Sequence, residues 1–131
     1  MSGNLKPLRW IGSTLKDLRD FPTEVRQVMG FALDQAQRGG KHRDAKPLRG
    51  FGGAGVLEIV DDYDGDTYRA VYTVNFGGVV YALHAFQKKS KSGIATPKQE
   101  IDLVKMRLKL AEEDYKELTK NEAKNKKGKG R

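Results

Sequence analysis

VLEIVDDYDGDTYRAVYTVNFGGVVYALHAF, residues 56–86, is rich in β-branched and aromatic residues and is interrupted twice by turn residues. Its composition predicts strands at 56–60, 67–74 and 79–86. Residues 61–66 and the glycine pair 77–78 supply the turns between them. Because consecutive strands joined by short turns pair with one another, this stretch predicts an antiparallel meander.

Two helices are predicted before the meander. Residues 5–11 form a short apolar strand, Ser13 caps a short helix, and Pro22 starts a second one. The second helix repeats apolar residues every three or four positions, at Val25, Val28, Met29, Ala32, Leu33 and Ala36. Gly39 and Gly40 end it. We therefore expect a strand and a helical hairpin packed across the sheet.

A long helix is predicted after the meander, since Thr96-Pro97-Lys98-Gln99 has the form of a capping box. Its apolar stripe is narrow and consists of Ile101, Val104, Leu108, Ala111, Tyr115 and Leu118. The stripe packs either on the chain's own sheet or on a partner protein. After Leu118 the apolar pattern ends, so we expect one α+β domain at 1–118 and a basic, disordered tail at 119–131.

The composition excludes several classes of protein. The 131 residues contain no cysteine, which rules out disulfides, thiolate metal sites and a cysteine nucleophile. No stretch has the roughly 18 apolar residues of a membrane span, and we expect a cytoplasmic protein. The glycine-rich residues 51–55 lack the Lys-Ser or Lys-Thr of a phosphate-binding loop.

The net charge of +8 is unevenly distributed. Residues 119–131 hold six Lys or Arg and one Glu and account for +5, leaving +3 for the rest. Two basic clusters remain, Lys41, Arg43, Lys46 and Arg49 in one loop and Lys88, Lys89 and Lys91 after the last strand. They either converge on one surface that binds a phosphate backbone or are ordinary solvated charges.

Arg69 is the only basic residue between Gly50 and Gln87 and lies in the middle of a predicted strand. It either pairs with Glu58 on the preceding strand or clamps a phosphate through two parallel hydrogen bonds. His84, a lone strand histidine, is more often packed than catalytic. His84 and His42 lack metal-site spacing. Val60 and Val71 occupy the positions where a calcium loop needs its first and last carboxylates, so we expect no metal or cofactor.

The order of these signals resembles the RelE superfamily of toxins, nearest to its HigB-like, phage-derived branch, over roughly residues 5–115. The resemblance rests on KPLRG at 46–50, LEI at 57–59, YRAVY at 68–72, and FQKK at 86–89 followed by Thr96-Pro97. It implies a RelE-like α+β fold. It also implies the toxin of a type II toxin–antitoxin pair, a ribosome-dependent mRNA endonuclease neutralised by an antitoxin with a helix-turn-helix domain.

The resemblance also assigns roles to residues. Arg69 matches the family's strand arginine, which steadies the scissile phosphate. Lys88 or Lys89 matches the family's basic position after the last strand. Glu58 matches a polar strand position that varies among family members. The loop and post-strand bases are expected to bind RNA, namely Lys46, Arg49, Lys41, Arg43 and Lys91.

The implied reaction is attack of a ribose 2′-OH on the neighbouring phosphate. Glu58 serves as the base, or a lysine whose pKa is lowered by neighbouring positive charges does so. Two other functions stay open. ParE-type relatives share the fold but inhibit DNA gyrase, and a nonenzymatic nucleic-acid or ribosome-binding module would use the same bases only to contact phosphates.

Overall fold

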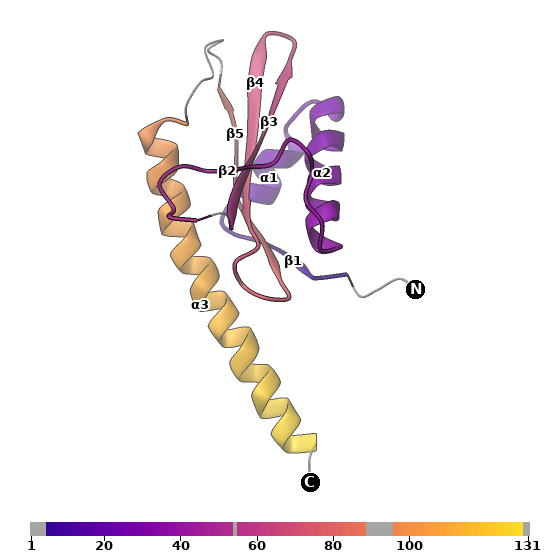
Figure 1. Ribbon diagram of the computed structural model, residues 1–131, viewed down its shortest axis with the longest axis vertical. Helices are drawn as coiled ribbons and strands as arrows, with labels where there is room; N and C mark the ends of the chain where they lie inside the picture. Colours follow the sequence, from indigo (N-terminus) through magenta and orange to yellow (C-terminus); the bar gives the residue numbers. More distant parts are fainter. Residues whose placement is uncertain (1–4, 54, 89–95, 130–131) are drawn as a thin grey trace.

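A computed structural model describes residues 5–53, 55–88 and 96–129 and contains one five-stranded sheet (Figure 1). Its order is β1-β5-β4-β3-β2. The strands are β1 (Leu8–Trp10), β2 (Lys46–Pro47), β3 (Val56–Tyr63), β4 (Asp66–Thr73) and β5 (Val80–Lys88). Strands β3, β4 and β5 pair antiparallel in sequence order, which confirms the meander, and β1 pairs parallel to β5.

The hairpin between β3 and β4 is longer than the sequence pattern predicted. Both strands continue until only Asp64 and Gly65 remain as the turn, with φ of 52° and 85°. A two-residue turn with positive φ at both positions matches the right-handed twist of the flanking strands, and Asp and Gly tolerate it. The acidic segment 61–66 is therefore mostly strand.

The helices lie on both faces of the sheet (Figure 1). Helices α1 (Thr14–Arg19) and α2 (Thr23–Gln37) cover one face, and α3 (Lys98–Lys129) crosses the other. Val25 and Met29 of α2 pack with Leu57 and Ile59 of β3, while Val104 of α3 packs on the opposite face. The predicted α+β fold and helical hairpin are confirmed, and the apolar stripe of α3 covers the chain's own sheet.

Helix α3 differs from its prediction at both ends. The Pro97 carbonyl accepts the N–H groups of Glu100 and Ile101, so the helix starts after Pro97, and the Thr96 side chain bonds elsewhere. At the other end the helical backbone continues past Leu118 to Lys129, where the sequence predicted no regular structure. Figure 1 shows this part of α3 extending beyond the sheet. The division of the chain at residue 118 stays a prediction.

A bulge in β5 brings extra side chains toward α3. Tyr72 pairs with Ala82 and Val71 with His84, so Leu83 is the inserted residue. Leu83 belongs to the core beneath α3, and His84 bonds to residues of α3. Within residues 5–53, 55–88 and 96–129, none of the helices has the length and the apolar composition that a membrane span requires.

Candidate functional site

The candidate site starts from three strands that place polar side chains on the face covered by α3. Lys46 of β2 pairs directly with Glu58 of β3, and opposed residues in a sheet point to the same face. Arg69 of β4 pairs with Val60, two residues beyond Glu58 on the same face. Glu58 and Arg69 are therefore diagonal neighbours, within reach of long side chains.

Arg69 and Glu58 form a buried ion pair. Arg69 Nη1 donates to Glu58 Oε1 at 3.2 Å and to Thr96 Oγ1 at 3.2 Å. Thr96 Oγ1 in turn donates to Glu58 Oε2 at 2.6 Å. Arg69 is only 2% exposed. The cross-strand pair is thus present, and both Glu58 oxygens accept hydrogen bonds.

Thr96 was assigned the wrong partner by sequence reasoning. Its hydroxyl was expected to cap α3, a local bond to a backbone N–H. In the fold it bonds instead to the carboxylate and guanidinium, because hydrogen bonds to charged groups are roughly twice as strong as neutral ones.

A cavity of about 500 Å³ opens above this pair. It is lined by Lys46, Pro47, Leu48, Arg49, Glu58, Thr96 and Ile101. Lys46 and Arg49 are exposed, while Glu58 is half-buried at the bottom. The cavity therefore has positive charge where a polyanion would enter and a carboxylate inside.

The other predicted bases do not all reach this cavity. Lys41 and Arg43 line a separate pocket beside α2, and Lys88 pairs with Thr67, two residues along β4 from Arg69. Lys89 and Lys91 lie outside the described residues. Lys46 and Arg49 of the loop thus share one cavity and Lys41 and Arg43 line another. The convergence of the loop bases with the bases after the last strand stays a prediction.

A second polar network fixes α3 to the sheet through the buried Arg107. This residue was not identified from the sequence as functional or structural. Its Nη1 donates to the Leu83 carbonyl at 3.0 Å and to Thr14 Oγ1 at 3.2 Å, and its Nη2 donates to Ser13 Oγ at 3.1 Å. The signal was available, because Arg107 falls inside the apolar stripe, three residues after Val104.

His84 belongs to the same network. Its Nε2 lies 2.5 Å from Glu100 Oε1, and its Nδ1 lies 3.5 Å from Arg107 Nη1. Because a carboxylate only accepts, the Nε2–H donates to Glu100. The ring also stacks on Phe86 with centroids 4.7 Å apart. His84 is packed and hydrogen-bonded, the commoner of its two expected situations.

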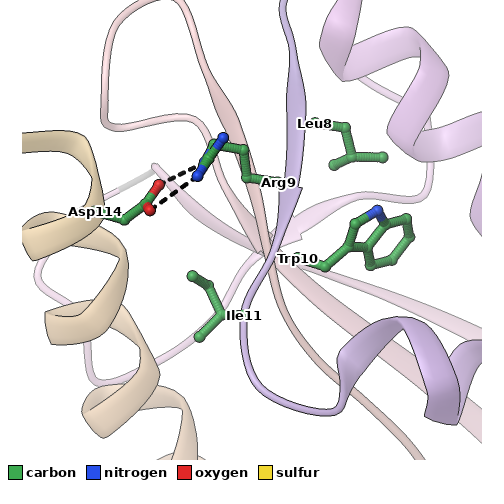
Figure 2. A pocket seen from close by; sticks show the side chains of 5 residues that line it. All are labelled: Leu8, Arg9, Trp10, Ile11 and Asp114. Atoms are coloured by element: carbon green, nitrogen blue, oxygen red, sulfur yellow. Dashed lines mark hydrogen bonds and ion pairs between the residues drawn. The ribbon is translucent and has the colours of Figure 1, made fainter. Parts of the chain in front are cut away.

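A third contact joins α3 to β1 beside a smaller cavity of about 300 Å³. Figure 2 shows Arg9 reaching Asp114 through two bonds, of 2.5 and 3.0 Å, while Leu8 and Trp10 point to the other side of β1. The Arg9 hydrogen bonds lower the pKa of Asp114, and the Tyr81 hydroxyl donates to it at 2.8 Å. The contact explains how the long α3 holds its position.

No group of three or more His, Asp or Glu side chains in residues 5–53, 55–88 and 96–129 lies where it could hold a metal ion. The described polar clusters are instead ion pairs and hydrogen-bond networks between strands and α3.

The fold places the chain among RelE-like α+β proteins. A mutant form of the E. coli toxin RelE in the free state matches with a TM-score of 0.52 and 19% identity, over 80% of this chain and 96% of that chain. A crystal structure of the isolated E. coli RelE toxin has 22% identity and a TM-score of 0.48, covering 77% of this chain and 97% of that chain. The toxin–antitoxin complex RelBE2 of Mycobacterium tuberculosis has 23% identity and a TM-score of 0.43, covering 66% and 95%.

The family follows from the sequence. Residues 16–109 match the family described as phage derived protein Gp49-like (DUF891), and the chain belongs to it. No curated protein matches the chain.

Proposed function

We propose that the protein is the toxin of a type II toxin–antitoxin pair and cleaves mRNA on the ribosome. The observation that carries the proposal is the cavity lined by the exposed Lys46 and Arg49 and by Glu58, whose carboxylate pairs with the buried Arg69. Its proposed partners are mRNA, the ribosome and a cognate antitoxin with a helix-turn-helix domain, all in the cytoplasm. The RelE-like fold supports the toxin class.

The proposed reaction needs no metal or cofactor. Glu58 takes the proton of a ribose 2′-OH, and the 2′-oxygen attacks the adjacent phosphorus. The bond to the 5′-oxygen breaks, and this oxygen takes a proton from water. The products are a 2′,3′-cyclic phosphate and a 5′-OH. RNA must displace the Thr96 hydrogen bond to free Glu58 Oε2 for this role.

The positive residues have separate roles in this scheme. Lys46 and Arg49 bind the incoming backbone because they are exposed. Arg69 is too buried to meet the backbone without a rearrangement, so it orients Glu58 and stabilises negative charge from below. Lys88 and Lys89 are proposed to stabilise charge on the phosphorane, and Lys91 to bind RNA.

The test uses exposed residues, because replacing Arg69 disturbs the buried pair as well as any chemistry. Lys46→Ala/Arg49→Ala should lower cleavage of translated mRNA at least tenfold in primer extension after induction, with thermal unfolding unchanged. Lys105→Ala/Lys109→Ala, exposed on α3, is the matched control. If the wild type produced no new 5′ ends, the nuclease proposal would fail.

A second candidate is a nonenzymatic ribosome-binding module. The burial of Arg69 and the two hydrogen bonds already made by the Glu58 carboxylate favour it. This candidate predicts co-sedimentation with ribosomes, lost in Lys46→Ala/Arg49→Ala, without RNA cleavage. Gyrase-dependent DNA breaks on induction would support ParE-like inhibition instead.

A further inference from the structure

The pocket beside α2 has features that the proposed cleavage site does not use. Its volume is about 380 Å³, and it is lined by Phe31, Gln35, Lys41, His42 and Arg43. None of these five residues is acidic. Helices α2 and α3 lie on opposite faces of the sheet, so this pocket and the cleavage cavity lie on different parts of the surface (Figure 1).

Phe31 is the most unusual residue of this pocket. It is 56% exposed, the most exposed large apolar residue of the described chain, and it points away from the face of α2 that buries Val25 and Met29. Exposing an aromatic ring to water forfeits burial energy. An exposed aromatic ring flanked by cations can bind a nucleotide, because every nucleobase has a face that stacks on such a ring.

The ring is also held in place. Phe31 meets the His42 ring edge to face, with centroids 5.7 Å apart and an interplanar angle of 83°. His42 is itself buried, and its Nδ1 accepts the Asp44 backbone N–H at 3.0 Å. A ring fixed in this way loses little conformational entropy when a base stacks on it.

The neighbouring polar groups fit a nucleotide. Lys41 and Arg43 are exposed, and within the described residues neither forms an ion pair. Gln35 Oε1 is a buried acceptor without a hydrogen-bond partner among the described residues. Leaving it unsatisfied costs stability, and a turn of the Gln35 side chain toward the pocket would let it accept from a base amino group.

From these observations we propose that this pocket binds one unpaired nucleotide of a single-stranded RNA. The base stacks on Phe31, and Lys41 and Arg43 contact the flanking phosphates. This pocket would be a second RNA contact of the toxin, and its assignment rests on the proposed function.

The experiment measures binding separately from cleavage. A fluorescent 2′-O-methyl oligonucleotide of about eight nucleotides has no 2′-OH to attack, so it stays intact whether or not the protein is a nuclease. Its affinity is measured by anisotropy in the Lys46→Ala/Arg49→Ala background, which removes the cavity's contribution. Phe31→Ala should weaken binding about 5- to 150-fold, the range for one stacked base, and Phe31→Trp should retain it.

Two further variants distinguish a specific nucleotide site from nonspecific binding to exposed residues. Lys41→Ala/Arg43→Ala should reduce the slope of log K against log salt by about 1.4, since each single-strand phosphate contact contributes about 0.7. Met106→Ala, at a 53% exposed apolar residue of α3, is the matched control and should leave binding unchanged.

Some results would overturn the proposal whether or not the protein cleaves mRNA. It fails if Phe31→Ala binds as well as its parent, or if Phe31→Leu binds as well as Phe31→Trp. It also fails if Phe31→Ala leaves RNA binding intact and instead weakens binding of the antitoxin, which would make the pocket a protein interface. Loss of binding in Phe31→Ala with no mRNA cleavage by the wild type would sustain the site and refute the nuclease.

Discussion

Glu58→Gln is the sharpest test of the buried pair at the candidate site. Glutamine keeps the shape of the side chain, and its carbonyl oxygen can still accept a hydrogen bond, but the negative charge is gone. Arg69 keeps its charge at 2% exposure and loses the carboxylate that lies 3.2 Å away. The substitution therefore isolates the electrostatic part of the interaction.

The magnitude follows from the distance and the burial. At an effective dielectric constant of about 20, unit charges 3.2 Å apart attract by about 5 kcal/mol. Removing one partner of a buried pair costs about 3–5 kcal/mol, because the other charge stays out of water. We expect the free energy of unfolding to fall by this amount. Glu58→Gln/Arg69→Met should lose much less, because no charge is then left behind.

The assay is urea unfolding followed by circular dichroism and by the fluorescence of Trp10, the only tryptophan. The matched control is Glu112→Gln, whose carboxylate lies 3.7 Å from Lys116 with side-chain exposures of 54% and 72%. That surface pair should contribute less than about 0.5 kcal/mol. Equal losses in Glu58→Gln and Glu112→Gln would refute the argument that burial makes the site pair strong.

Two further predictions concern the core and the approach of α3 to the sheet. The Tyr72 hydroxyl is buried without a hydrogen-bond partner among the described residues, and burial raises its pKa to about 12. Since unfolded tyrosine titrates near pH 10, its contribution to stability is complete below pH ~10 and is lost above it, by about 1.4 kcal/mol at pH 11. Urea unfolding at pH 8 and pH 11 should show a smaller alkaline loss for Tyr72→Phe than for the wild type, and equal losses would contradict the shift. An alanine at position 12, where φ is 59°, would place its Cβ 2.9 Å from the Arg107 side chain, whereas one at position 52, where φ is 67°, would meet open space. Gly12→Ala should therefore lower the melting temperature by several degrees more than Gly52→Ala. Equal melting temperatures of the two variants would show that Arg107 moves freely and would contradict the prediction.

The sequence by itself determined the strands of the meander and the order of the helices, but neither β2, which lies in the predicted basic loop, nor the helical residues after Leu118. The three-and-four spacing in α2 and α3 defined their buried stripes. It also singled out Arg69 and gave Glu58 as one of its two expected partners, because an isolated strand arginine needs an acceptor on the neighbouring strand. These inferences succeed because each depends on residues close in sequence or on adjacent strands.

Only the tertiary structure decided which distant residues meet. Thr96 bonds to Glu58, 38 residues away, rather than to its own helix, because packing of α3 brings its hydroxyl to a buried charge. Lys41 and Lys46 are five residues apart, yet they line different pockets, since the chain enters β2 between them. Local sequence patterns do not show which distant residues come into contact. Side-chain periodicity specifies which face of an element is buried, whereas the packing of whole elements specifies which residues that face contacts.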